Sequence, residues 1–334
     1  MSLQYAWYKG RAWVWVLLPF TMLFYTLSHL RRLLFKLHVL PSYKSSLKVV
    51  IVGNISVGGN GKTPTVIALA EHLLSKGVSC AVLLRGYGGT QTQFPYLLQG
   101  DDDPHDVGDE PALIARRLNI PVVIDPKRAR GAAFIEQHTH AQVLLCDDGL
   151  QHYALQRDIE LCVMDGRGVG NGYLLPMGPL RESVARLNSV DYIVYNGEQP
   201  HTQAALSKVS TDIAQMQLLP SAWVNVKTHE QISLAQGLSL FSSEARVVAL
   251  AGIGHPQRFF DTLNASGIEV SESLAFADHH QFKPTDMPKA DFVLMTEKDA
   301  VKCASFAEQN AWYLRVDAKL PKTFYEYMCA KLDV

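Results

Sequence analysis

The residues best suited to chemistry lie in a glycine-rich stretch between an apolar run at 49–52 and an amphipathic segment at 65–76. A strand, a glycine-rich loop and a helix opened by Gly-Lys-Thr are the parts of a phosphate-binding loop. Glycines let backbone N–H groups surround an anion, a lysine reaches the outer phosphates, and a threonine hydroxyl ligates Mg²⁺. We therefore expect a nucleoside triphosphate to bind at Gly58, Gly59, Asn60, Gly61, Lys62 and Thr63.

One position departs from the usual pattern of such a loop. Ser56 stands where G-x-x-x-x-G-K-[ST] has its first glycine. Gly53, Gly58 and Gly59 are close enough to supply the backbone freedom instead. The alternative is a glycine-rich turn that binds nothing.

Two adjacent carboxylates follow another apolar run, at 142–146. In phosphate-loop proteins such a strand lies near the loop, and its acid holds Mg²⁺ directly or through water. We therefore predict that Asp147 and Asp148 contribute to a Mg²⁺ site, with an exposed turn as the alternative because Gly149 follows. Gln151 and His152 complete a polar cluster beside the same strand end, where we expect substrate to bind.

Three further segments carry side chains that could contact a ligand. Arg85 and Tyr87 follow the run at 80–84 and could meet a phosphate and a sugar or acyl chain, unless this is only a flexible loop. Asp109 opens an expected helix, either as a base facing the phosphates or as a helix cap. Arg181 offers a cation to a transferred phosphoryl group, and Glu182 a carboxylate to the metal or to Arg181 itself. A surface ion pair is the alternative for these last two.

The second half of the chain carries one more candidate site, Asp278-His279-His280. An aspartate beside an imidazole can tune it for general base catalysis. Metal ligation is the alternative, although no third ligand at a suitable spacing is evident. The segment at 296–299, Thr-Glu-Lys-Asp, follows an apolar run at 291–295, where α/β proteins place functional groups.

The elements expected to position these residues alternate along the chain. Strand-like runs at 49–52, 80–84, 122–124, 142–146, 161–164 and 192–195 alternate with helical patterns at 65–76, 111–118 and 128–138. This alternation predicts an α/β fold with a parallel sheet and flanking helices, like that of P-loop NTPases. A second, smaller α/β lobe is expected from strand patterns at 246–251, 291–295 and 312–316 and a helical pattern at 256–265.

We accordingly divide the chain into four segments. They are an N-terminal membrane anchor helix at 1–40, a nucleotide-binding domain at 41–196, a linker with short strands at 197–240, and a C-terminal α/β lobe at 241–334. The linker has weak periodicity, and its candidate strands at 213–219 and 223–228 are expected to be antiparallel.

The N-terminal segment has the composition of a membrane anchor. Residues 12–30 carry no charge, three tryptophans lie near the start, and the basic residues are more numerous after the run than before it. This asymmetry predicts that the body of the protein lies on the cytoplasmic side. A spanning helix, a helix lying in the membrane surface and an ordinary buried helix remain alternatives. No small-residue cleavage site follows, so a cleaved signal peptide is not expected.

Composition limits the other classes. The net charge of −1 over 334 residues provides no overall positive field, so nucleic acid is not an expected partner. The five cysteines form no C-x-x-C motif, which is typical of a protein from a reducing compartment. No feature indicates an obligate protein partner.

Taken together, these motifs resemble the tetraacyldisaccharide 4′-kinase family of lipid A biosynthesis. Besides the phosphate-binding loop, the resemblance rests on Arg85-Gly86-Tyr87-Gly88, Gly108-Asp109-Glu110-Pro111, Asp147-Asp148-Gly149-Leu150-Gln151-His152, Gly178-Pro179-Leu180-Arg181-Glu182, Phe276-Ala277-Asp278-His279-His280 and Thr296-Glu297-Lys298-Asp299. Departures are Leu84, where Ser is common, and Phe282, where Tyr is frequent.

The resemblance implies transfer of the ATP γ-phosphoryl group to the 4′-hydroxyl of a tetraacylated glucosamine disaccharide 1-phosphate, forming lipid IVA. It implies ATP and Mg²⁺ as cofactors and a location on the cytoplasmic face of the inner membrane of a Gram-negative bacterium. It also implies that Asp109 and His279 act together on the acceptor hydroxyl. Lys62 and Arg181 would neutralise phosphate charge, and Asp147, Asp148 and Glu182 would hold or surround the metal.

Two other classes remain as alternatives. A membrane-associated P-loop ATPase or GTPase, acting as a switch or metallochaperone, would explain the loop and the carboxylates but not the Asp-His-His segment. A non-catalytic membrane-bound module that needs nucleotide only for folding is the other.

Overall fold

A computed structural model describes residues 3–10, 12–59, 61–197, 206–241 and 244–334. The strands are β1 (Lys48–Gly53), β2 (Cys80–Leu84), β3 (Tyr96–Leu97), β4 (Val122–Ile124), β5 (Val143–Asp147), β6 (Ile159–Asp165), β7 (Tyr192–Asn196), β8 (Ile213–Asn225), β9 (Gln231–Ile232), β10 (Val247–Ala251), β11 (Glu272–Ala275), β12 (Phe292–Thr296) and β13 (Ala311–Lys319). The α-helices are α1 (Leu3–Lys9), α2 (Leu18–Lys36), α3 (Lys62–Ser75), α4 (Pro104–Val107), α5 (Asp109–Leu118), α6 (Arg128–His138), α7 (Leu234–Leu240), α8 (Pro256–Ala265), α9 (Glu297–Cys303) and α10 (Lys322–Leu332). Short 3₁₀ turns are η1 (Ala12–Leu17), η2 (Val184–Ser189), η4 (Leu206–Lys208) and η5 (Pro284–Asp286).

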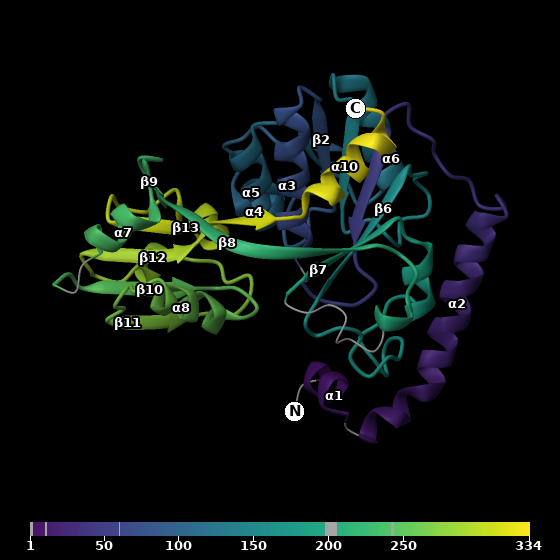
Figure 1. The fold of residues 1–334 in the computed structure, drawn as a ribbon, viewed down its shortest axis with the longest axis horizontal. Helices are drawn as coiled ribbons and strands as arrows, with labels where there is room; N and C mark the ends of the chain where they lie inside the picture. Colours follow the sequence, from purple (N-terminus) through teal and green to yellow (C-terminus); the bar gives the residue numbers. More distant parts are fainter. Residues whose placement is uncertain (1–2, 11, 60, 198–205, 242–243) are drawn as a thin grey trace.

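The strands form one sheet that extends through two lobes (Figure 1). Its order is β11-β10-β12-β13-β8-β7-β6-β1-β5-β2-β4-β3, with β9 beside β8. In the larger lobe β1 lies between β5 and β6, all parallel, so the segments that follow these strands meet at one edge. This confirms the predicted α/β fold with a parallel sheet, flanking helices and a second lobe.

Strand β1 shows why the apolar runs become central strands. Val50 and Val52 belong to a buried cluster with α3, α5 and α10. Val49 and Ile51 point to the opposite face, in a cluster that includes residues of α6. A strand covered by helices on both faces must be apolar at every position, and this explains the continuous rather than alternating pattern.

The predicted linker differs from its expected structure. Instead of two antiparallel pieces, β8 is one strand, parallel to β7 over 213–216 and antiparallel to β13 over 217–225. Its middle positions alternate between exposed and partly buried where it passes from one lobe to the other (Figure 1). The apolar pattern is therefore weak, although the strand is paired along its length except for a register shift at Ser221. The boundaries of the four segments stay a prediction.

The last helix, α10, packs against the larger lobe, although its position in the sequence placed it in the smaller, C-terminal lobe. Leu320, Phe324, Met328 and Leu332 belong to the same buried cluster as α3 and α5 of the larger lobe. Figure 1 shows α10 beside α3, reached through β13. The two lobes are therefore joined by both β8 and the segment that follows β13.

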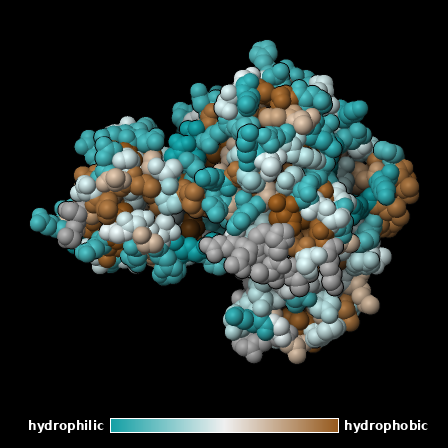
Figure 2. All heavy atoms as spheres, viewed as in Figure 1, coloured by the Kyte–Doolittle hydropathy of each residue, from teal (hydrophilic) through white to brown (hydrophobic). Residues whose placement is uncertain are grey.

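The N-terminal helices lie along the outside of the larger lobe. The stretch Ala12–Lys36 is long and apolar enough to cross a membrane, and 11% of its most apolar window is buried. Figure 2 shows apolar side chains along the edge of the molecule where α2 lies. Hydrogen bonds join the N-terminal helices to the body: Trp7 Nε1 of α1 donates to Pro176 O at 3.0 Å, Met177 N donates to Thr21 Oγ1 of α2 at 3.1 Å, and Arg32 Nη2 of α2 donates to Ser189 Oγ at 3.2 Å.

Candidate active site

The loop between β1 and α3 has the backbone of a phosphate-binding loop. Gly61 is the N-cap of α3 with a φ of 98°, and a Cβ there would lie 2.7 Å from Met216 Cε. Glycine adopts that positive φ without strain, and it leaves the first N–H groups of α3 facing the loop. Lys62 Nζ lies 3.3 Å from Gly58 O and 3.7 Å from Asp148 Oδ1, so the lysine folds back over the loop.

Neighbouring strands support the same loop. Arg167, which follows β6, donates to Gly59 O at 2.7 Å. Ser56, at the position of the missing glycine, forms an antiparallel bridge with Leu180. The predicted ligand Asn60 lies outside the described residues.

The end of β5 fits a divalent cation. Thr63 Oγ1 donates to Asp147 Oδ2 at 3.2 Å, because β5 is next to β1 and its end lies beside the start of α3. Asp147 is 3% exposed, and its Oδ1 has no hydrogen-bond partner among the described residues. Burial, reinforced by the charge of Glu110, raises the pKa of Asp147. A buried carboxylate oxygen without a partner, beside a threonine hydroxyl, is the donor set that Mg²⁺ binds in phosphate-loop proteins.

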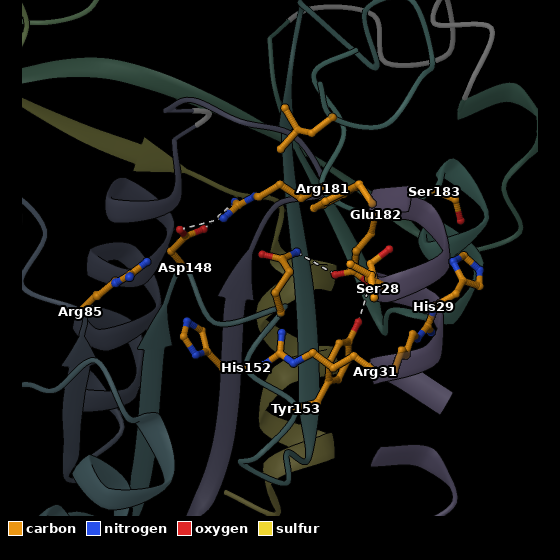
Figure 3. A pocket seen from close by; sticks show the side chains of 15 residues that line it. Ser28, His29, Arg31, Arg85, Asp148, His152, Tyr153, Arg181, Glu182 and Ser183 are labelled. Carbon is orange, nitrogen blue, oxygen red and sulfur yellow. Dashed lines mark hydrogen bonds and ion pairs between the residues drawn. The ribbon is translucent and has the colours of Figure 1, made fainter. Parts of the chain in front are cut away.

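Asp148 faces two cations rather than the Thr63–Asp147 pair. It has a φ of 50°, which turns its side chain away from the line of β5. Arg181 donates to both of its oxygens, at 3.0 and 2.7 Å. Figure 3 shows the Asp148 and Arg181 side chains pointing toward each other. Burial alone would raise the pKa of Asp148, but the hydrogen bond from Arg181 and the charge of Lys62 outweigh it and lower the pKa. Asp148 is therefore a carboxylate that holds Arg181 beside Lys62.

The two lobes meet at Asp109 and His279. Asp109 is the first residue of α5 and is 4% exposed. His279 follows β11 in the smaller lobe, and its Nδ1 lies 3.0 Å from Asp109 Oδ2. The preceding Gly108 has a φ of 97°, and a Cβ there would lie 2.7 Å from Tyr87 O, so the loop after β2 lies directly against this pair.

A cavity of about 560 Å³ lies between α2 and the polar segments after β5. Arg85, Gln151 and His152, three of the predicted substrate-binding residues, line it, and α2 supplies Phe24 and Leu27. Figure 3 shows the α2 side chains on one side and Arg85, Asp148 and His152 on the other. Tyr87, the fourth predicted residue, is 72% exposed, and its ring centroid lies 5.9 Å from that of His279.

Glu182 lines the same cavity but has protein partners. Gln151 Nε2 donates to its Oε1 at 2.7 Å, the Tyr153 hydroxyl donates to Oε2, and Arg186 Nε lies 3.3 Å from Oε2. Across the residues that the structure describes, no three acidic, histidine or cysteine side chains form a group that could hold a metal ion. The expected cluster of Asp147, Asp148 and Glu182 is therefore not formed, because both oxygens of Glu182 are held by Gln151, Tyr153 and Arg186.

Sequence reasoning missed two residues that hold these groups in place. Asn54 Nδ2 donates to Gly58 O at 3.1 Å, and its Oδ1 accepts from Arg181. Arg128 is 2% exposed and donates to Asp147 O at 2.8 Å. Asn54 stands between the strand and the loop in the sequence, which is a usable signal. Arg128 lies in a basic stretch typical of a protein surface, and nothing there indicates burial.

The fold and this site define a phosphate-loop nucleotide-binding protein whose second lobe places a histidine beside an aspartate of the first. The chain belongs to the tetraacyldisaccharide-1-P 4′-kinase family (LpxK), whose family model matches residues 13–333.

Curated relatives and a solved structure match this chain over nearly its whole length. The chain is 45% identical over 330 residues to the tetraacyldisaccharide 4′-kinase of Psychromonas ingrahamii, with 98% of each chain covered. It is 46% identical over 316 residues to that of Pseudoalteromonas atlantica, covering 94% of this chain and 99% of the relative. The crystal structure of the "apo" form of LpxK from Aquifex aeolicus in complex with ATP is similar, with a TM-score of 0.82, 26% identity and coverage of 96% and 99%.

Proposed function

We propose that this protein transfers the γ-phosphoryl group of ATP to the 4′-hydroxyl of a tetraacyldisaccharide 1-phosphate, giving lipid IVA. The observation that carries this proposal is the 3.0 Å contact of His279 with Asp109 in a protein with a phosphate-binding loop. Family membership and the ATP complex named for the Aquifex aeolicus relative support the same reaction. A nucleotide switch would leave the contact between the lobes without a role.

In this mechanism His279 is the general base. Its Nδ1–H donates to Asp109, which leaves Nε2 to accept the proton of the sugar hydroxyl. The hydroxyl oxygen bonds to the γ-phosphorus as the bond from that phosphorus to the bridging oxygen breaks, and ADP leaves. Asp109 holds the ring in one orientation and stabilises the imidazolium that forms.

Charge neutralisation is the other requirement of phosphoryl transfer. Lys62 lies over the loop, and Arg181 is held beside it by Asp148. Mg²⁺, which Thr63 and Asp147 would hold, supplies further positive charge when bound. We therefore assign Lys62 and Arg181 to the phosphoryl group and Asp148 to the position of Arg181.

We place the acceptor in the cavity beside α2. Arg85, Gln151 and His152 offer cationic and polar groups to a phosphorylated sugar, while Phe24 and Leu27 offer apolar contact to acyl chains. Tyr87, whose ring lies beside that of His279, would contact the sugar of the acceptor.

We also propose that Ala12–Lys36 holds the enzyme at the cytoplasmic face of the inner membrane. Phe20, Leu23 and Leu30 are 62%, 58% and 50% exposed, a large apolar surface for a helix in water. Arg31 and Arg32, near the end of α2, would meet anionic headgroups.

Co-sedimentation of the full chain with vesicles of anionic phospholipid tests this membrane anchor. Leu23→Asp with Leu30→Asp should abolish binding, whereas Leu74→Asp, on the body, should not; equal binding by all would refute the anchor.

Transfer of labelled phosphate from ATP to a purified lipid A precursor tests the reaction. His279→Ala should lower turnover by about 10² to 10⁴-fold, the usual contribution of a general base. Asp109→Asn should also lower turnover, whereas substitution of the exposed Asp261 of α8, Asp261→Asn, should match the wild type. Full turnover by the His279→Ala protein would eliminate the proposed pair. ATP hydrolysis without any phosphorylated lipid would favour the switch instead.

The metal site has a separate test that does not depend on turnover. ATP with Mg²⁺ should raise the unfolding temperature of the wild type above that with ATP and a chelator. Asp147→Asn should remove the Mg²⁺-dependent part of this rise, since the amide lacks the charge that binds the ion. An unchanged Mg²⁺ effect would contradict the assignment.

A further inference from the structure

Lys298 lies at the Asp109–His279 contact, although the mechanism above gives it no role. It is the second residue of α9, which begins where β12 ends, at the same edge of the smaller lobe as the loop after β11. Thr296 caps α9 by accepting a hydrogen bond from Asp299 N at 3.2 Å, and this fixes the direction of the first helical turn. The lysine is therefore placed by a rigid element rather than by a mobile loop.

The Lys298 ammonium contacts three groups at once. Its Nζ lies 3.4 Å from His279 Nδ1 and 3.5 Å from Nε2. It also lies 3.6 Å from Asp278 Oδ1 and 3.9 Å from Asp109 Oδ2. Nearly equal distances to the two ring nitrogens place the ammonium beside the ring as a whole, not in line with one nitrogen.

The charged groups around His279 indicate what the Lys298 ammonium does beside the ring. Asp109 of α5 lies 3.0 Å from one ring nitrogen, and Asp278 of the same loop lies 3.9 Å from the other. The exposed Tyr87 approaches the ring edge from the loop after β2. Within the described part of the chain, Lys298 is the only lysine or arginine in an ion pair with either aspartate.

Two carboxylates beside one imidazole favour the protonated ring, which cannot accept another proton. A cation at 3.4–3.5 Å from the ring nitrogens opposes that protonation and reduces the repulsion between the two aspartates. We propose that Lys298 is a positioning residue that holds Asp109 and Asp278 about His279 and keeps the ring free to accept the hydroxyl proton. This inference rests on the proposed role of His279 as the base.

The test compares pH profiles of phosphate transfer by the full-length wild type and its Lys298→Met, Lys298→Arg, His279→Ala and Lys289→Met variants. Lys298→Met should lower kcat at neutral pH by up to about tenfold, the effect of losing one favourable charge interaction beside the base, with KM for ATP unchanged. The loss should be smaller at higher pH, because fewer protons then compete with the sugar hydroxyl for the base. Lys298→Arg keeps the charge and should retain most of the activity, and Lys289→Met, at an exposed lysine of the same lobe, should match the wild type.

The outcomes separate the two proposals. If His279→Ala is inactive but Lys298→Met has the wild-type kcat and pH profile, Lys298 has no such role and the base assignment stands. If His279→Ala is fully active, both fall. Equal losses in Lys298→Met and Lys298→Arg with unmoved pH profiles would show that shape and not charge matters, which overturns the inference. If the Met variant unfolds, Lys298→Gln takes its place, because it also removes the charge and the same outcomes then decide.

Discussion

Replacing Arg117 by methionine should weaken the junction of the two lobes. Arg117 lies on α5, and its side chain is 3% exposed. Its Nε lies 3.3 Å from Glu71 Oε1 of α3, its Nη1 lies 2.9 Å from Glu297 Oε2 of α9, and its Nη2 pairs with Asp317 of β13. One guanidinium thus joins two elements of the smaller lobe to two of the larger.

The magnitude follows from what the substitution leaves behind. Glu297 is 17% exposed, and burial already raises its pKa against the opposing charge of Arg117. Removing one partner of a buried ion pair costs about 3–5 kcal/mol. Glu71 and Asp317 are more exposed and keep Arg315 as a partner, at 3.1 and 3.3 Å. We therefore expect the lower end, about 3 kcal/mol of unfolding free energy.

Urea denaturation at pH 7 is the assay, with Lys322→Met as the matched control. Lys322 pairs with Glu326 at 3.0 Å, but the two side chains are 89% and 58% exposed, so this loss should fall within error of the wild type. Since the Asp109–His279 contact crosses the same junction, phosphate transfer should also fall in the Arg117→Met protein. Equal unfolding midpoints for both variants would refute the reasoning.

Three other outcomes are expected. Lys62→Ala should weaken ATP binding measured by calorimetry by about tenfold to a hundredfold, the loss of one charged hydrogen bond; unchanged affinity would contradict the loop assignment. Burial raises the pKa of Cys146 to about 12, and Cys329 is the only one of the five cysteines that is not buried. A thiol reagent should therefore label Cys329 first in the folded protein. Earlier labelling of any other cysteine would contradict this prediction. Burial and the charge of Arg128 lower the pKa of His152 from 6.5 to about 4, so the unfolded chain binds a proton in this range that the folded protein does not. Stability to urea should therefore fall as the pH drops from about 6.5 to about 4, and His152→Asn should flatten that dependence.

The sequence alone determined the features that are encoded by residues adjacent to one another along the chain. The phosphate-binding loop is readable because its glycines, Lys62 and Thr63 must be contiguous to surround an anion at a helix start. Strands such as β1 are readable because burial on both faces requires an unbroken apolar run. The apolar length of Ala12–Lys36 also follows from composition, whereas its exposure became known only from the structure.

Tertiary structure decided the contacts between distant segments. No local pattern pairs Asp109 with His279, 170 positions apart, and only the family resemblance predicted that they act together. Glu182 is directed to Gln151 and Tyr153 instead of the expected metal cluster, and Lys298 is brought to the pair from a third segment. Such contacts depend on where β5, β11 and β12 end once the whole sheet has formed, and side-chain spacing along the chain does not encode those distances.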